Sequence, residues 1–106
     1  MIEIKNAIIR ETFLGYEDNG IFTYRLQLDY GSSGQAAGMV TLGGEYTHKA
    51  VKGLIDIVGV KCWEELKGKY VRVIAEATRV HNIGNILDDG RWFNIETSMT
   101  DYHDRA

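Results

Sequence analysis

The clearest pattern in the chain is an alternation of apolar and polar residues over residues 21 to 30. Strict period two over about ten residues predicts an antiparallel strand with one buried face. The apolar positions are Phe22, Tyr24, Leu26, Leu28 and Tyr30. Residues 2 to 14 are rich in β-branched side chains and predict one strand, or two with a break near Asn6. Asn19-Gly20 indicates a hairpin, because both residues accept positive φ.

The period changes after Gly43-Gly44. Residues 45 to 58, "EYTHKAVKGLIDIV", place apolar residues at spacings of three and four, which predicts an amphipathic helix. The apolar positions are Tyr46, Ala50, Val51, Leu54, Ile57 and Val58. Gly59 then fits a left-handed C-cap.

Shorter patterns complete the expected fold. Residues 36 to 42 predict a third strand, and "KCWEELKG" predicts a helical turn that packs Trp63 and Leu66 onto the core. Residues 69 to 77, residues 79 to 87 and the stretch "RWFNIE" predict three more strands. The result is an α+β fold: a mostly antiparallel β-sheet with one main amphipathic helix, about 45–58, packed on one face.

Length and composition bound the architecture and the partners. A chain of 106 residues fits a single domain, 1–106, with a polar C-terminal tail at about 97–106. A chain this small buries a modest core, which favours a homo-oligomer, dimer or higher. With 12 basic and 15 acidic side chains the net charge is −3, which argues against binding of long nucleic acid. A local basic cluster still permits a small anionic ligand.

The remaining features point to the cytoplasm. No run approaches the roughly 20 apolar residues of a membrane span. The start "MIEIKNAIIRE" carries charges where a signal peptide needs an apolar core. The single cysteine, Cys62, forms no disulfide within the chain, and beside Trp63 it is expected to be a buried structural thiol.

The segment "GSSGQAAG", residues 31–38, is the first candidate for chemistry. Its spacing, Gly-x2-Gly-x3-Gly without a following lysine, fits neither the Walker loop nor the dinucleotide fingerprint. A hairpin connection between strands is the commoner explanation of such a segment. The alternative is a binding loop, in which small residues admit a ligand to the backbone and Ser33, Gln35 and Gly38 contact it.

The helix start is the second candidate. Free N–H groups at a helix N-terminus suit a phosphate, so Gly44 is a candidate contact. His48 and Lys49, in the first two turns, would add positive charge. An ordinary solvated helix face explains the same residues.

The two strands over residues 69–87 are the third candidate. Arg72 can grip a phosphate, and Asn82 and Asn85 can read a base edge. Trp92 and Phe93 could stack on a base. The alternative is a polar outer face with both aromatics in the core.

The sequence gives little support for an enzymatic function. The three histidines lie far apart, without the spacing of a metal site, and no motif resembles an activated nucleophile. We therefore expect a protein that is not an enzyme and uses no cofactor or metal.

Three stretches together resemble a known family: "LGYEDNGIFTYRLQLDYGSSGQAAG", "IVGVKCWEELKGKYVRV" and "IGNILDDGRWFN". They are similar to a set of small bacteriophage proteins that includes the first-described class of phage anti-Thoeris proteins. The resemblance spans most of the chain, from about Ile2 to Phe93. This chain departs from the pattern around Glu45 to Lys49, where relatives often carry a charged insertion. It also has Ala36 and Ala37 where others often have glycine and an aromatic residue.

The resemblance implies a sponge. Members of that class form oligomers and sequester, without cleavage, the cyclic ADP-ribose-type signals made by host TIR enzymes, and some bind cyclic oligonucleotides. It implies a ligand held between subunits by arginine, asparagine and an aromatic residue, with Asn85 and Arg105 as participants.

The expected function follows from the resemblance and the candidate residues. We expect a phage-encoded protein of the host cytoplasm that sequesters a small nucleotide signal and so counters antiviral defence. The alternative is a small phage inhibitor that contacts a host defence enzyme, since an acidic protein with an exposed hairpin suits a basic protein surface.

Overall fold

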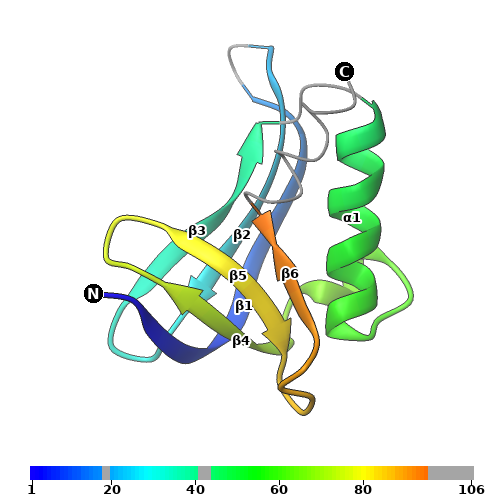
Figure 1. Cartoon of the computed structure of the whole chain (residues 1–106). Helices are drawn as coiled ribbons and strands as arrows, with labels where there is room; N and C mark the ends of the chain where they lie inside the picture. The colour runs from blue at the N-terminus through cyan, green and yellow to red at the C-terminus, as the bar shows by residue number, and fades with distance from the viewer. Residues whose placement is uncertain (18–19, 41–43, 96–106) are drawn as a thin grey trace.

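The structure, a computed structural model, describes residues 1–17, 20–40 and 44–95. Its elements are β1 (Glu3–Tyr16), β2 (Phe22–Asp29), β3 (Gly34–Val40), α1 (Gly44–Val58), the 3-10 helix η1 (Trp63–Leu66), β4 (Tyr70–Ala75), β5 (Val80–Asn85) and β6 (Trp92–Asn94). All six strands form one antiparallel sheet in the order β3-β2-β1-β4-β5-β6. The helix α1 runs beside the curled sheet (Figure 1), so the predicted α+β fold is confirmed.

The inner face of the sheet, which α1 covers, carries the core. Alternate residues of β2 and β4 are buried there, because successive side chains of a strand point to opposite faces. From the helix, Tyr46, Ala50 and Leu54 are fully buried against them. The helix lies close to β6 at one point, where a Cβ on Gly53 would stand 2.7 Å from the Phe93 ring.

Two buried tyrosines join the helix to β2. The hydroxyl groups of Tyr24 and Tyr46 lie 3.0 Å apart, and either one can donate the hydrogen bond. Burial raises the pKa of the Tyr24 hydroxyl far above its ordinary value, and the bond to Tyr46 raises it further. Burial also raises the pKa of the Tyr46 hydroxyl, so both groups stay neutral. Their shared bond uses one of the two O–H donors, and the Tyr46 O–H also lies 3.5 Å from the Ile95 carbonyl as a donor.

The helix ends where the sequence predicts. Gly59 has φ +86°, the left-handed conformation expected of a C-cap, and its N–H donates to Ile55 O at 2.9 Å. The turn after it is also as predicted: Leu66 of η1 is fully buried and Trp63 packs against the core.

Strand β1 runs unbroken through Asn6, as the one-strand alternative predicts, and its irregularity lies between Ile9 and Glu11, which leaves Arg10 as an extra residue opposite β2. Two other predicted details are wrong. Strand β3 starts at Gly34 rather than at residue 36. Cys62 is exposed rather than buried, because it precedes η1 on the surface while Trp63 and Leu66 turn inward.

Some predictions lie outside the described residues. These are Asn19 of the predicted hairpin turn, residues 41–43 and the predicted C-terminal tail. In the described part of the chain, none of the helices has the length and apolar character needed to cross a membrane.

Candidate functional site

The outer face of the sheet gathers polar and aromatic side chains from strands far apart in the sequence. Register pairs Asn6 of β1 with Arg72 of β4, Arg72 with Gly84 of β5, and Gly84 with Trp92 of β6. Paired residues of an antiparallel sheet share one face, so these four positions form a row across four strands. A second row beside it consists of Ile4, Ile74, Asn82 and Asn94.

The indole of Trp92 lies flat on Gly84. A Cβ at Gly84 would stand 2.6 Å from Cε3 of Trp92, so only glycine leaves room for the ring. The Trp92 N–H donates to the Asp89 carbonyl at 2.6 Å, which fixes the orientation of the ring. The side chain is only half-buried, and its remaining exposed surface is available for stacking.

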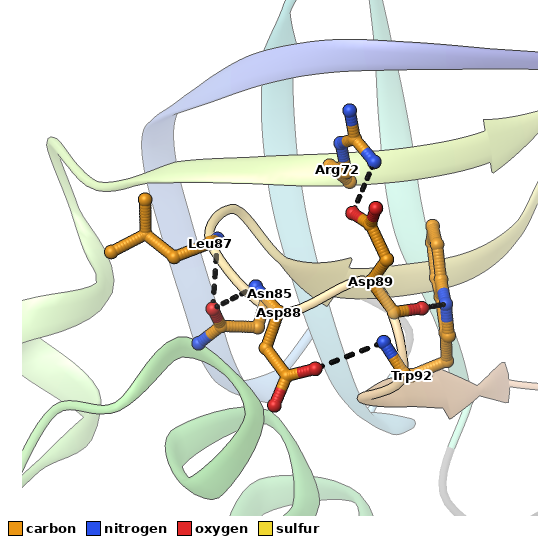
Figure 2. Close-up of polar contacts among 7 residues, drawn as sticks. Arg72, Asn85, Leu87, Asp88, Asp89 and Trp92 are labelled. Atoms are coloured by element: carbon orange, nitrogen blue, oxygen red, sulfur yellow. Dashed lines mark hydrogen bonds and ion pairs between the residues drawn. The ribbon is translucent and has the colours of Figure 1, made fainter.

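Asp89 connects Trp92 to Arg72. Its carbonyl accepts from the indole, while its carboxylate pairs with Nη1 of Arg72, as Figure 2 shows. The carboxylate is 78% exposed, whereas the Arg72 side chain is 34% exposed and its Nε is buried without a hydrogen-bond partner among the described groups. The guanidinium is thus held against the sheet by a partner that is itself largely in water.

Two asparagine side chains flank this pair. The amides of Asn6 and Asn82 make no hydrogen bond to any described residue. Each amide can therefore donate to and accept from a ligand. We name Asn6, Arg72, Asn82 and Trp92 the outer patch. Of the sequence-predicted candidates, Arg72, Asn82 and Trp92 meet there, whereas Phe93 points to the inner face and is 7% exposed.

Asn85 lies at the end of β5, but its amide is occupied by the protein. Nδ2 donates to the Ile57 carbonyl at 2.8 Å, and Oδ1 accepts from the N–H groups of Leu87 at 2.9 Å and Asp88 at 3.0 Å. Figure 2 shows the hydrogen bonds from Leu87 and Asp88 to the Asn85 side chain. These contacts give Asn85 a structural role at the helix end and in the β5–β6 turn.

The candidates on the glycine segment are also separate from the outer patch. Gln35 is a strand residue that accepts from the Tyr30 hydroxyl at 2.6 Å and donates to the Glu76 carbonyl at 2.7 Å. It thereby links β3 to the turn between β4 and β5. Gly38 faces β2 so closely that a Cβ would stand 2.1 Å from Tyr24 O, and Ser33 is exposed in the turn before β3.

The helix candidates lie on the other side of the sheet. Gly44 begins α1, His48 is exposed and Lys49 is half-buried. Because α1 packs on the inner face, these residues do not join Arg72 and Asn82. Arg105 lies outside the described residues.

A pocket that sequence reasoning missed opens at the bulge of β1. Its volume is about 280 Å³, and its walls are Asn6, Ala7, Ile8, Arg10, Asp29, Tyr30, Gly31 and Tyr70. Arg10 Nε donates to Asp29 Oδ2 at 2.9 Å, and the Gly31 N–H donates to Oδ1 at 2.7 Å. Only the bulge brings Arg10 beside the end of β2, and no local sequence pattern marks a bulge without the register. We call it the bulge pocket.

The two hydrogen bonds hold the pKa of the Asp29 carboxyl below its ordinary value, with the bond from Arg10 as the larger cause. A lowered pKa in the folded state stabilises the protein above the unfolded pKa, and this contribution is lost as pH falls through the folded pKa. We expect the carboxyl ¹³C resonance of Asp29 to titrate with a midpoint below the ordinary value, and Arg10→Gln to raise that midpoint. Arg25→Gln, which removes an arginine paired with Glu17 elsewhere on β2, is the control. An equal midpoint in the wild type and Arg10→Gln would contradict this assignment.

Among the described residues, no three His, Cys, Asp or Glu side chains lie close enough together to hold a metal ion. Comparison with protein-family models, with curated proteins and with solved structures gave no match.

Proposed function

We propose that the protein binds a small nucleotide signal, of cyclic ADP-ribose or cyclic nucleotide type, on the outer patch and holds it without converting it. In a phage-infected cell this would withdraw the signal from host antiviral defence. The observation that carries the proposal is the meeting of Arg72, Asn82 and Trp92 on one sheet face that α1 leaves uncovered. The resemblance to phage anti-Thoeris proteins supplies the class of signal.

Each group has a distinct part in the proposed binding. The fork of Arg72 suits a phosphate, the Trp92 ring suits a base, and the amides of Asn6 and Asn82 suit the edges of a base or ribose hydroxyl groups. A phosphate would replace the exposed Asp89 carboxylate as the partner of Arg72. An exposed ion pair contributes only about 0–1 kcal/mol, so the exchange costs little.

Calorimetry on the full chain tests this arrangement, with cyclic ADP-ribose, its glycosidic isomers and cyclic dinucleotides as ligands. Trp92→Ala is expected to weaken binding by roughly tenfold, because base stacking contributes ~1–3 kcal/mol. Arg72→Gln is expected to weaken it by a similar factor through loss of the charged hydrogen bonds.

Asp89→Asn separates the proposed roles. It removes the competing charge but keeps the carbonyl that orients Trp92, so it is expected to leave affinity equal or higher. The matched control is Arg25→Gln, another paired arginine on a strand. The proposal is wrong if none of these ligands binds, or if a ligand binds equally to the wild type, Trp92→Ala and Arg72→Gln. Mass spectrometry of the ligand released by denaturation should recover it intact.

The proposal includes a homo-oligomer in which a second copy closes over the ligand. Ile4 and Tyr70 beside the outer patch are 64% and 62% exposed, and burial of such side chains favours association. Light scattering at micromolar concentration should give at least twice the chain mass of 12.0 kDa.

A second candidate function, inhibition of a host defence enzyme by direct contact, is favoured by the same exposed apolar residues and by Leu87, which is 92% exposed. Purification from host lysate distinguishes the two. A stoichiometric host protein lost on Leu87→Asp supports the inhibitor, and a released small molecule supports the sponge.

A further inference from the structure

The bulge pocket has the features of a binding site in its own right. Its polar groups come from β1 and the end of β2, and Tyr70 of β4 lines it with an aromatic side chain, whereas the Tyr30 ring packs against the core with the Lys5 ammonium over its face. Tyr70 is 62% exposed, and its ring is a large apolar surface in water beside a cavity. Small-molecule sites combine such apolar walls with a few fixed polar groups.

The polar groups of the pocket offer donors and acceptors side by side. Arg10 uses Nε on Asp29, and in the described part of the chain its Nη groups make no hydrogen bond. Each Asp29 oxygen accepts one bond and has a further lone pair. The Asn6 amide adds one donor group and one acceptor. A ligand with a hydrogen-bond donor and an acceptor on one edge could bond to the carboxylate and the guanidinium at the same time.

The charge of the pocket walls and the volume of the pocket restrict the class of ligand further. Arg10 and Asp29 are the only ionised side chains among the residues that form the walls, and their charges cancel. The Asp29 carboxylate is 30% exposed and is also held by the Gly31 N–H, so a phosphate would displace it from its arginine less readily than it would displace the 78% exposed Asp89. A flat uncharged ring keeps its stacking energy without displacing Asp29. A volume of about 280 Å³ lies at the lower end of small-molecule sites, which suits one ring system rather than a whole dinucleotide.

We propose that the bulge pocket binds an uncharged planar heterocycle of the nucleobase class, stacked on Tyr70 and read at its edge by Arg10, Asp29 and Asn6. This deepens the proposed function, on which the choice of ligand class rests. Asn6 belongs to both the pocket and the outer patch, and Tyr70 lies two residues from Arg72 on β4, about 7 Å along the strand. One ligand with a base and a phosphate could therefore reach both places.

Two-dimensional ¹H–¹⁵N NMR of the full chain tests the pocket with probes that lack a phosphate. Adenosine, guanosine, cytidine and uridine are titrated one at a time, followed by inorganic phosphate alone. At least one nucleoside is expected to shift the Gly31 and Asn6 amide resonances, while phosphate leaves them in place. The inference is overturned if no nucleoside moves Gly31, or if phosphate alone reproduces the shifts.

Variants of exposed residues complete the test. Tyr70→Ala is expected to weaken the nucleoside by roughly tenfold, as loss of one stacked ring does, and Tyr70→Phe to retain it. Arg10→Gln is expected to weaken it as well, whereas Arg25→Gln, which removes a matched arginine outside the pocket, is not. Unchanged affinity in Tyr70→Ala would overturn the assignment.

The Trp92 indole N–H separates this inference from the proposed function. A nucleotide that shifts Trp92 but not Gly31 supports the outer patch and overturns the pocket. Nucleosides that shift Gly31, with no nucleotide effect at Trp92, support the pocket and count against the outer patch.

Discussion

Gly38→Ala is expected to lower the free energy of unfolding by about 3 kcal/mol, and denaturant unfolding measures the loss. A Cβ at this position would stand 2.1 Å from Tyr24 O and 2.9 Å from Arg25 Cα, both backbone atoms of the neighbouring strand. Backbone cannot rotate away as a side chain can, so β2 and β3 would have to separate. Overpacking of a tight site costs ~1–3 kcal/mol, and the φ of +145° adds strain for any other residue.

Gly68→Ala provides the matched control for Gly38→Ala. Gly68 has φ +90° with nothing within 4 Å of an added Cβ, so its replacement brings backbone strain without a clash. A cost of about 1–2 kcal/mol is expected there. Equal losses in the two variants would show that strain, rather than the approach of β2 and β3, explains the glycine. A larger loss in Gly38→Ala than in Gly68→Ala would show that the close approach of β2 requires glycine at position 38, whether or not a ligand binds there.

Asn85→Ala is expected to destabilise the protein by roughly 3 kcal/mol, because three hydrogen bonds of about 1 kcal/mol each are lost. The amide joins the Ile57 carbonyl at the end of α1 to the N–H groups of Leu87 and Asp88 in the β5–β6 turn. For a domain of this size the melting temperature should fall by about 12 °C or more, which calorimetry measures.

Asn85→Asp isolates the link to the helix. Aspartate keeps an oxygen for Leu87 and Asp88 but loses the donor to Ile57 and places a negative charge at the helix C-terminus, where the helix dipole disfavours it. The loss of stability in Asn85→Asp should therefore come mainly from the broken contact between residue 85 and the end of α1. If Asn85→Ala leaves the melting temperature unchanged but abolishes ligand binding, the structural role is wrong and the ligand role suggested by the family resemblance is correct.

The elements that sequence reasoning found best are those with a clear period. Strand β2 alternates throughout, and α1 shows its stripe from Tyr46 to Leu54, because each buries one continuous side. Arg72 and Asn82 were also recognisable as candidates, since polar residues on a half-buried strand point outward. Their meeting with Trp92 depends on the register, which no local pattern fixes.

What sequence reasoning missed depends on long-range pairing. Gln35 suggested a ligand contact, yet its amide bonds to a carbonyl 41 residues away. The bulge at Arg10 shifts the register of β1 against β2 and creates the pocket beside Asp29. Neither feature leaves a periodic signal, because each rests on one residue and its partner across the sheet.

The packing of the Trp92 ring against Gly84 couples two positions that are eight residues apart. Any side chain at 84 would displace the indole, whereas loss of the indole would expose bare backbone at 84 and remove the reason for glycine there. Substitutions at the two positions are therefore interdependent. In diverging descendants of this chain, glycine and tryptophan should be kept or exchanged as a pair, and a lineage that replaces one alone should carry a change in the β5–β6 turn that offsets it.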